Sequence, residues 1–282
     1  MTNAFNLQTN TPTLWVKNLP KLTPDSNKYT RGYAMIYGGY PITGAARLAA
    51  LAAARIGAGI TTILVPEIAL PIYASSLLSM MARPFNTLAE IESLADDGRI
   101  SAFLIGPGAG VNAQTRNATL TLLSKNKPTV LDADALSIFE NDVELLKKSI
   151  TSPCVLTPHE GEFKRLFTLG NDRVESPVQA AQYLNAVILL KGHQTIIASP
   201  DGKVAINQHA PTTLATAGSG DVLAGIVTGL LAQGMPAFEA ACAAVWMHSE
   251  AAHQFGVGLI ADDLPAMLIG VMKKLNQSLM CE

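Results

Sequence analysis

Short apolar segments alternate with helical patterns along most of the chain, after a polar lead that contains Pro12, Pro20 and Pro24. Runs that are short, apolar and ended by Gly, Pro or Asp predict strands at residues 33–37, 61–65, 102–105, 128–131, 154–156 and 187–190. Helical patterns predict helices at residues 45–56, 113–124, 161–169, 178–185, 222–233, 237–253 and 263–274. Strands that alternate with helices indicate right-handed crossovers and a mostly parallel sheet.

One segment departs from this alternation. Residues 195–198 and 203–206 flank Pro200-Asp201-Gly202, a turn sequence that favours a β-hairpin. No linker, composition break or internal repeat divides the chain. We therefore expect one α/β domain over residues 1–282, with a mostly parallel central sheet covered by helices on both faces.

Composition and charge exclude several classes of protein. Hydrophobic residues make up 49% of the chain and charged residues 15%, which excludes a disordered or supercharged chain. A formal net charge of -2 gives no electrostatic reason to expect DNA or RNA binding. Cys154, Cys242 and Cys281 are unevenly spaced and have no nearby His, which argues against a disulfide framework or a zinc site and fits a reducing compartment.

Neither a leader nor a membrane span is expected. Residues 1–10 carry no basic segment followed by an apolar core, so they do not read as a secretory signal. The longest apolar candidate, residues 44–65, is interrupted by Arg47, Arg55 and several Gly, and resolves better into a helix followed by a strand. We expect a soluble cytoplasmic protein that binds no membrane.

The residues with chemical potential follow the predicted strands. Ligands in an open parallel sheet bind at the carboxyl ends of the strands. The segments concerned are Gly38-Gly39, Gly106-Pro107-Gly108-Ala109-Gly110, Asp132-Ala133-Asp134, Thr157-Pro158-His159-Glu160-Gly161-Glu162 and Lys191-Gly192. If the sheet is as predicted, these loops share one edge.

The segment 215–221, Ala-Thr-Ala-Gly-Ser-Gly-Asp, delivers one carboxylate to the start of a predicted helix. Amides of a glycine-rich turn and of a first helical turn lack intrahelical acceptors, so they attract anions, and the helix dipole adds to the attraction. A carboxylate beside a phosphate site is repelled by the ligand unless it takes a proton or holds a metal. Asp221 is therefore either a base in an anion site or the cap of a helix beginning at Val222.

Two glycine-rich loops have both a structural and a ligand-binding interpretation. Residues 39–44 have the glycine spacing of a P-loop, but Ala45-Ala46 stand where Lys and Ser/Thr should follow, so this is no Walker motif. The loop either packs a helix closely on a strand or lets a ligand lie against the backbone. Residues 106–110 hold three Gly in five positions, which favours a ligand loop over a bare turn.

The charged residues at the strand ends also have two interpretations each. Asp132 and Asp134 either bind magnesium through water or serve as caps, and Asp134 suits a helix N-cap better. His159, close to two Glu, favours ligand contact over a structural role. Lys191 either binds a nucleotide or is solvated. His248 and His253 do not share a helix face, so we interpret both as structural.

The order of these segments resembles the ADP- or ATP-dependent NAD(P)H-hydrate dehydratases, a family of the ribokinase-like superfamily. The resemblance covers residues 27–268. Many ribokinase-like kinases share a Gly-Ser-Gly-Asp turn, whereas its combination with Thr157-Pro158-His159 and the Leu-Asp-Ala-Asp-Ala-Leu run at 131–136 is much narrower. It also rests on Gly106-Pro107-Gly108, Leu190-Lys191-Gly192 and residues 215–223. The resemblance implies a ribokinase-like, three-layer αβα fold.

The implied activity is repair of damaged nicotinamide cofactor. The S form of hydrated NADH or NADPH would be phosphorylated on its hydroxyl and then lose phosphate, with ADP, giving AMP and phosphate, as the first expectation and ATP as the other candidate. Asp221 would deprotonate that hydroxyl as the phosphoryl group arrives. The anion hole would be formed by Ala217, Gly218, Ser219 and Gly220.

The family's binding residues carry over onto matching positions of this chain. The hydrated dinucleotide would be bound by Ala45, Gly108, His159 and Asp221. The adenine nucleotide would be bound by Lys191, Gly192, His193, Gln194, Thr195 and Gly220. Magnesium is expected with the nucleotide, and its ligands stay unassigned.

Some positions depart from the family's pattern. Residues 27–32 lack the His-Lys-Gly opening often seen in relatives, and residues 75–81 lack a Glu near Met80, which affects details of the substrate pocket. His193 and Gln194 stand where relatives often have small residues, which affects the choice of nucleotide. The family is often fused to an epimerase domain, whereas we expect this chain to be the dehydratase alone, acting beside a separate epimerase. The resemblance also suggests a homotetramer.

Two other functions compete with this one. A ribokinase-like kinase of a small alcohol or vitamin precursor would use Asp221 and its turn equally well, but such kinases more often carry Asn in place of His159. A non-catalytic nucleotide-binding protein would share the fold. The retention of Asp221 with its neighbouring glycines argues against that second alternative.

Overall fold

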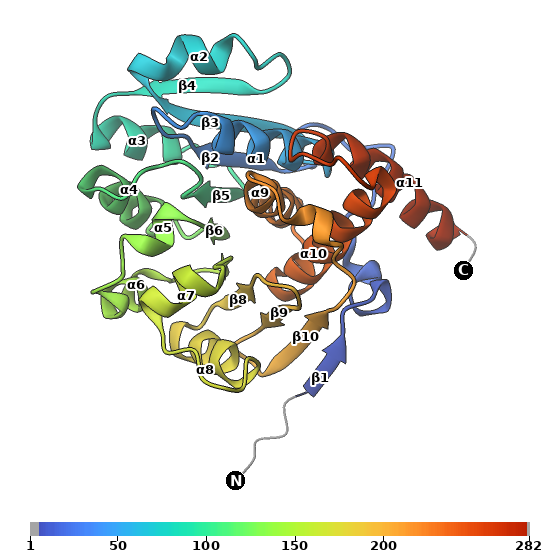
Figure 1. Cartoon of the computed structure of the whole chain (residues 1–282). Coiled ribbons are helices and arrows are strands. Elements are labelled where there is room, and N and C mark those ends of the chain that lie inside the picture. Colours follow the sequence, from blue (N-terminus) through green and yellow to red (C-terminus); the bar gives the residue numbers. More distant parts are fainter. Residues whose placement is uncertain (1–5, 281–282) are drawn as a thin grey trace.

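A ten-stranded sheet forms the centre of the computed structural model, which describes residues 6–280 (Figure 1). The strand order is β1-β10-β9-β8-β7-β6-β5-β2-β3-β4. Strand β9 is antiparallel to β8 and β10, and the other neighbouring pairs are parallel. The strands are β1 (Asn6–Thr9), β2 (Tyr33–Tyr37), β3 (Ile60–Pro66), β4 (Met81–Phe85), β5 (Ala102–Ile105), β6 (Thr129–Leu131), β7 (Cys154–Leu156), β8 (Val187–Leu190), β9 (Thr195–Ala198) and β10 (Lys203–Asn207).

Helices cover both faces of this sheet (Figure 1). One face carries α1 (Gly44–Arg55), α9 (Ser219–Ala232), α10 (Ala237–Phe255) and α11 (Leu264–Met280). The other carries α3 (Leu88–Ala95), α4 (Ala113–Leu123), α5 (Asp134–Ser137), α6 (Val143–Ser149), α7 (Glu160–Leu166) and α8 (Glu175–Leu184). The short helix α2 (Leu70–Ala74) packs beside edge strand β4. Single 3-10 turns occur at Pro12–Leu14, Val16–Asn18, Glu67–Ala69 and Thr212–Leu214.

The central strands are apolar at consecutive positions because both faces of the sheet are buried. Alternate side chains of a strand point to opposite faces. In β2, Ala34 and Ile36 pack in the core beneath α1 and α9, whereas Met35 and Tyr37 pack in the core on the other face. A two-sided core of this kind explains the short continuous apolar runs of the sequence.

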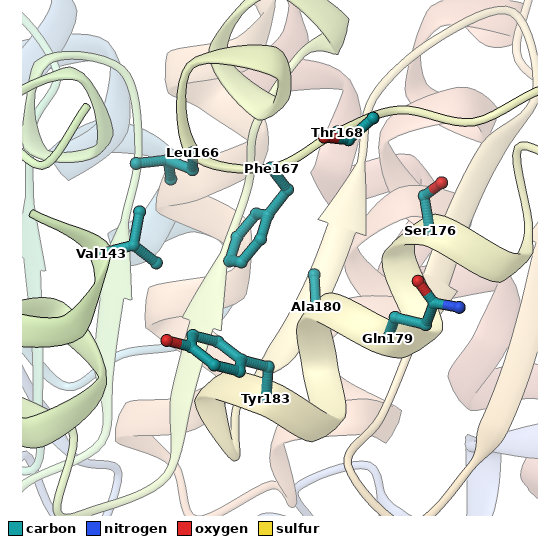
Figure 2. A pocket seen from close by; sticks show the side chains of 8 residues that line it. All are labelled: Val143, Leu166, Phe167, Thr168, Ser176, Gln179, Ala180 and Tyr183. Atoms are coloured by element: carbon teal, nitrogen blue, oxygen red, sulfur yellow. The ribbon is translucent and has the colours of Figure 1, made fainter. Parts of the chain in front are cut away.

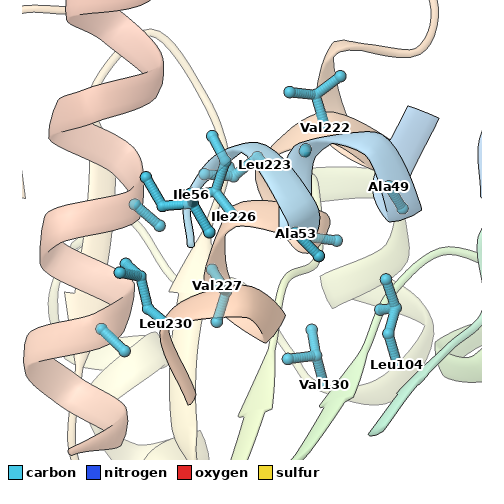
Figure 3. Close-up of a cluster of buried hydrophobic side chains, with 14 of the residues drawn as sticks. Ala49, Ala53, Ile56, Leu104, Val130, Val222, Leu223, Ile226, Val227 and Leu230 are labelled. Carbon is cyan, nitrogen blue, oxygen red and sulfur yellow. The ribbon is translucent and has the colours of Figure 1, made fainter. Parts of the chain in front are cut away.

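Helix α9 packs closely against α1, and two glycines make this possible (Figure 3). A Cβ on Gly225 would lie 2.2 Å from the backbone oxygen of Ala49, and a Cβ on Gly229 would lie 2.3 Å from Ile56 Cγ2. Val222, Ile226 and other apolar side chains of α9 fill the space around this contact. Packing at backbone distance fixes the position of α9, and with it the polar turn at its N-terminus.

All six predicted strands are present, four with the predicted bounds, and the predicted hairpin is formed by β9 and β10. The sequence analysis missed β1, β4, α2, α3 and α6. Strand β4 is a mostly exposed edge strand that contains Arg83 and Pro84, so it has no apolar run to reveal it. Helix α3 did carry a signal, since Thr87 and Glu90 form a capping box at its start.

The described cysteines are free thiols, and the longest apolar stretch of the sequence is divided between a helix and a strand. Cys154 and Cys242 are buried and carry no disulfide, and burial raises the pKa of Cys154 to about 12. Cys281 and residues 1–5 of the N-terminal segment lie outside the described residues. The apolar stretch 44–65 forms α1 and β3. Within the described part of the chain, no helix has the length and apolar character needed to cross a bilayer.

Candidate active site

A cavity of about 580 Å³ lies beyond the carboxyl ends of β7 and β8, beside the start of α9. Its wall comes from segments that are far apart in the chain. The lining residues are His159, Lys191, Gly192, His193, Thr195, Ala210, Pro211, Thr212, Leu214, Ala215, Thr216, Ser219, Gly220, Leu223, Val245, His248 and Ser249. The predicted site residues in this wall are His159, Lys191, Gly192, His193, Thr195, Ser219 and Gly220.

Helix α9 begins earlier than predicted, which changes the role of Asp221. Its N-cap is Gly218, in the left-handed conformation at φ 89°, and the helix itself starts at Ser219. Asp221 is therefore not the cap of a helix beginning at Val222 but a residue of the first helical turn, so that interpretation was wrong. The first-turn amides have no intrahelical acceptors and lie beside the carboxylate, the arrangement expected of an anion site with a base.

The carboxyl group of Asp221 has a raised pKa, so its protonated and ionised forms are both well populated at neutral pH. The pKa is raised to about 7, mainly by burial and also by the neighbouring carboxylate of Asp132, whereas Lys191 acts to lower it. Asp134 and Glu162 add smaller repulsions. A carboxyl group with a pKa near 7 can take up and release a proton at neutral pH, which suits a general base.

Lys191 is the cation at the centre of these carboxylates. Its Nζ lies 2.9 Å from Asp132 Oδ1 and 3.9 Å from Glu162 Oε2. A Cβ on Gly220 would lie 3.2 Å from the same Nζ, which places the ammonium beside the first turn of α9. Burial disfavours its charged form, but the attractions of Asp132 and Glu162 outweigh that effect and raise the pKa of Lys191. Lys191 is thus a permanently charged part of the cavity wall rather than a solvated surface residue.

The two aspartates after β6 have separate structural roles. Asp132 is buried, and its Oδ1 accepts hydrogen bonds from Lys191 Nζ and, at 2.8 Å, from Thr157 Oγ1. Asp134 is the first residue of α5 rather than its N-cap, which is Ala133, so the predicted capping role was wrong. Its Oδ2 instead accepts from the amide of Gly110 at 2.8 Å and holds the glycine-rich loop. In the described residues, no three His, Cys, Asp or Glu side chains converge as metal ligands.

His159 caps α7 and keeps a fixed orientation at the cavity mouth. Its Nδ1 accepts from the amides of Gly161 at 2.9 Å and Glu162 at 3.2 Å, and its own amide donates to Glu162 Oε2 at 2.8 Å. Because Nδ1 is an acceptor, Nε2 carries the hydrogen, 3.4 Å from Glu162 Oε1. The half-exposed imidazole can therefore donate from Nε2 to a ligand.

The two glycine-rich loops pack against each other beside this cavity. A Cβ on Gly39 would lie 1.7 Å from Gly108 O, and a Cβ on Gly106 would lie 1.6 Å from Asp132 O. A Cβ on Gly108, where φ is 65°, would lie 3.4 Å from Ala45 Cβ. Close backbone packing accounts for Gly39 and Gly106. Ala45 and Gly108 are neighbours, but neither lines the 580 Å³ cavity.

The predicted nucleotide segment and anion hole line the cavity only in part. Gln194 is exposed and absent from the wall, unlike Lys191, Gly192, His193 and Thr195. Ser219 and Gly220 contribute to the wall, whereas Ala217, Gly218 and Asp221 do not. Leu48 Cδ1 and Ala261 Cβ would lie within 3 Å of a Cβ on Gly218, so that turn is enclosed by neighbouring elements.

The cavity wall also contains residues that the sequence analysis missed. His248, interpreted above as structural, lines the cavity, and its Nε2 lies 3.3 Å from Ser219 Oγ. Burial lowers its pKa to about 4. Val245, His248 and Ser249 lie three and four positions apart on α10, and that shared helix face was the available signal. His253 lies away from the cavity wall, with Nε2 at 2.7 Å from His209 O.

A second hollow, of about 380 Å³, lies between α6, α7 and α8 (Figure 2). Its wall consists of Val143, Leu166, Phe167, Thr168, Ser176, Gln179, Ala180 and Tyr183. None of these side chains is charged at neutral pH, and the hydroxyl of Ser176 already accepts from the amide of Gly170. This hollow therefore lacks the groups needed for acid–base chemistry or phosphate binding.

Comparison with known proteins gives concordant matches. A family model described as NAD(P)H-hydrate dehydratase matches residues 34–269. The chain is 38% identical over 239 residues to the ADP-dependent (S)-NAD(P)H-hydrate dehydratase of Neisseria meningitidis, covering 81% of this chain and 78% of that protein. It also matches the bifunctional NAD(P)H-hydrate repair enzyme of Salinibacter ruber at 36% identity over 269 residues, covering 88% of this chain and 49% of the enzyme. The chain thus spans about half the length of that bifunctional relative.

Solved structures agree with these sequence matches. The ADP/ATP-dependent NAD(P)H-hydrate dehydratase of Bacillus subtilis, co-crystallised with ATP and Mg²⁺, superposes with a TM-score of 0.83 at 31% identity, covering 96% of this chain and all of that one. A ribokinase-like superfamily protein of Enterococcus faecalis superposes with a TM-score of 0.86 at 25% identity, covering 96% of each chain. The predicted ribokinase-like α/β fold is confirmed.

Proposed function

Because the chain belongs to the NAD(P)H-hydrate dehydratase family, we propose that it dehydrates the S form of hydrated NADH or NADPH at the expense of an adenine nucleotide. The observation that carries this proposal is the position of Asp221 in the first turn of α9, beside unpaired amides and Lys191. That arrangement supplies a proton acceptor and an anion site within one helical turn. A hydroxyl is a poor leaving group, and phosphorylation would convert it into a good one.

The reaction has two steps. Asp221 takes the proton of the substrate hydroxyl, whose oxygen attacks the terminal phosphorus of ADP and releases AMP. The carbon–oxygen bond of the phosphorylated hydrate then breaks, phosphate leaves, and loss of a proton from the adjacent carbon restores the dihydronicotinamide ring. The amides at Ser219 and Gly220 hold the transferring phosphoryl group, and Lys191 offsets its charge. ATP would react in the same way and release ADP.

The remaining candidate residues have roles consistent with this reaction. Ala45, Gly108 and the Nε2–H of His159 would bind the hydrated dinucleotide beside the cavity. Gly192, His193 and Thr195 would bind the adenine nucleotide, with Gly220 at its phosphates. The apolar side chains of Pro211, Leu214 and Val245 in the cavity wall suit an adenine ring. Gln194 is exposed and would contact the nucleotide only through its backbone.

Magnesium fits the site in a supporting role. Asp132 and Asp134 supply oxygen donors, the kind that Mg²⁺ prefers, but within the described residues no three His, Cys, Asp or Glu side chains are placed to hold a metal ion together. The ion would therefore be held mainly by the nucleotide phosphates, with these aspartates reaching it through water. Magnesium bound in this way would neutralise phosphate charge during transfer.

The proposal also covers the source of the substrate, the phosphoryl donor and the oligomeric state. Bifunctional relatives carry out hydrate repair with a second activity on the same chain, and a separate epimerase would supply the S form to this protein. ADP is the proposed first donor, because the Neisseria relative is ADP-dependent. We also propose that the protein forms a homotetramer and is located in the cytoplasm.

The test is a direct assay of cofactor repair. The purified protein is incubated with hydrated NADH, magnesium and either ADP or ATP, and the return of dihydronicotinamide absorbance is followed. We expect nucleotide-dependent recovery that is lost in Asp221→Asn. No recovery with either nucleotide, together with phosphate transfer to a small alcohol, would place the protein among the ribokinase-like kinases instead.

A further inference from the structure

Arg173 lies on the segment between α7 and α8, next to the nucleotide cavity but outside every motif considered so far. Its backbone is positioned by Asp172, whose Oδ1 accepts from the amides of Val174 at 2.8 Å and Glu175 at 3.4 Å. Its guanidinium reaches across to α7, where Nη2 lies 2.9 Å from Glu160 Oε1. The side chain therefore extends toward the loops at the carboxyl ends of β7 and β8.

The guanidinium packs directly on Gly192. A Cβ at that position would lie 2.6 Å from Arg173 Nη2, 3.4 Å from Cζ and 3.5 Å from Nη1. Gly192 lines the cavity between Lys191 and His193. A side chain at residue 192 would displace the guanidinium from this position on the cavity wall.

The donors of Arg173 are incompletely used. Nε and Nη2 are buried, and neither has an acceptor at hydrogen-bond geometry among the described residues. A guanidinium has five N–H donors and cannot lose its charge, so buried donors without acceptors are costly. Glu160 supplies an ion pair to one nitrogen only. An anion with several oxygens would complete the set, and a phosphate group matches the guanidinium fork.

We propose that Arg173 binds the phosphate chain of the adenine nucleotide, with its guanidinium packed on Gly192 at the edge of the cavity. This proposal rests on the proposed function, because it requires a nucleotide in that cavity. The phosphate chain would then meet two cations, Lys191 beside the first turn of α9 and Arg173 over Gly192. The second cation would compensate the excess of carboxylates near Lys191, which by itself repels a polyphosphate.

A purely structural role for Arg173 makes a different prediction. If the residue served only to tie α7 to the 191–193 loop through Glu160, removing either partner would have the same effect. If it binds phosphate, Glu160 is a competitor for the guanidinium and a source of repulsion. Removing the charge of Glu160 would then leave nucleotide binding intact or tighten it.

The experiment measures binding of ADP and of adenosine to the full-length protein by displacement of a fluorescent ADP analogue, with thermal unfolding of each variant as a folding control. We expect Arg173→Gln to weaken ADP about 10- to 100-fold and adenosine less than about twofold. Arg173→Lys should fall in between, because it keeps the charge and loses the fork, and it stands in if Arg173→Gln does not fold. Glu160→Gln should not weaken ADP.

The matched control is Arg165→Gln, which removes an exposed arginine near the other end of α7, where Nη1 donates to Ser137 Oγ. It should leave ADP binding unchanged. Equal weakening of ADP and adenosine by Arg173→Gln, or equal effects of Arg173→Gln and Glu160→Gln on ADP, would overturn the proposal. If the wild-type protein binds no adenine nucleotide, the proposed function fails; if it binds ADP normally and Arg173→Gln does too, only this inference fails.

Discussion

Lys191 Nζ donates to Asp132 Oδ1 at 2.9 Å, although the two residues are 59 positions apart in the chain. Asp132 follows β6 and Lys191 follows β8, and Thr157, which follows the intervening strand β7, donates to the same oxygen at 2.8 Å. Three adjacent parallel strands thus deliver one residue each to a single buried ion pair. The sheet order, rather than any local sequence, creates this part of the site.

The first prediction concerns this ion pair. Asp132 is 1% exposed, so Lys191→Met leaves a buried carboxylate without its cation and should lower the free energy of unfolding by about 3–5 kcal/mol. The double variant Lys191→Met/Asp132→Asn removes both charges and should regain most of that loss. Urea denaturation of the three proteins measures the effect. A double variant no more stable than Lys191→Met would show that the pair is not the source of the loss.

The second prediction concerns catalysis by Asp221. Asp221→Asn keeps the shape of the side chain but cannot accept the hydroxyl proton, so kcat for hydrate dehydration should fall by about 10²- to 10⁴-fold. ADP binding should persist, because the amides and Lys191 are untouched and a nearby carboxylate is gone. The measurement combines the dehydratase assay with ADP binding. Loss of ADP binding in a folded variant would assign Asp221 to the nucleotide instead.

The third prediction concerns the pH dependence of the reaction. The pKa of Asp221 is raised to about 7, and only the ionised form can act as base. Plots of kcat/KM against pH should therefore show an acidic limb centred near that value, falling about tenfold per pH unit below it. The Asp221→Asn variant, assayed at high enzyme concentration, should lack the limb. A wild-type profile that stays flat down to pH 5 would contradict the base assignment.

The fourth prediction concerns stability, and its sign follows from the same raised pKa. The folded pKa of Asp221 lies above the ordinary value of 3.8, so the folded state holds its proton more tightly than the unfolded chain. This contribution to stability is fully present below about pH 4 and is lost as pH rises through about 7. Asp221→Asn removes the burden of a buried ionised carboxylate and should be about 2 kcal/mol more stable at pH 8, a value reduced for partial hydration of the side chain.

The measurement for the fourth prediction is the difference in Tm between wild type and Asp221→Asn at several pH values. That difference should shrink from pH 8 to pH 5, where the wild-type side chain is protonated in the folded protein. A constant difference across this range would mean that the stability effect comes from something other than ionisation of Asp221.

Features of this structure that depend on neighbouring residues in the chain could be predicted from the sequence, whereas features that depend on contacts between distant segments could not. The buried strands and the residues after them are local signals, because a strand buried on both faces must be apolar and its end must turn. Gly218 shows the limit: it is the N-cap of α9, and its turn is enclosed by Leu48 and Ala261, which are far from it in the chain. Sequence patterns do not report such long-range contacts.

The missed site residues have the same physical explanation. His248 lies on α10, whose apolar sequence is typical of a core helix. The position of α10 beside the cavity brings His248 into contact with Ser219. Arg173 lies on a polar connection that resembles an ordinary surface loop, and its contact with Gly192 depends on the adjacency of the segments after α7 and β8. Local composition is a weak guide to a residue whose role depends on a partner far along the chain.

The last prediction concerns His248, which contributes a hydrogen bond without a charge. Its Nε2 lies 3.3 Å from Ser219 Oγ, and burial lowers its pKa to about 4. His248→Leu leaves the buried hydroxyl of Ser219 without this partner at the start of α9, and ADP binding should weaken about tenfold. His248→Gln can still hydrogen-bond and should lose less. Because the wild-type imidazole stays neutral, the weakening of ADP binding by His248→Leu should be the same at pH 6 and pH 8. A weakening that grows on acidification with a midpoint near pH 6.5 would mean that burial does not keep His248 uncharged.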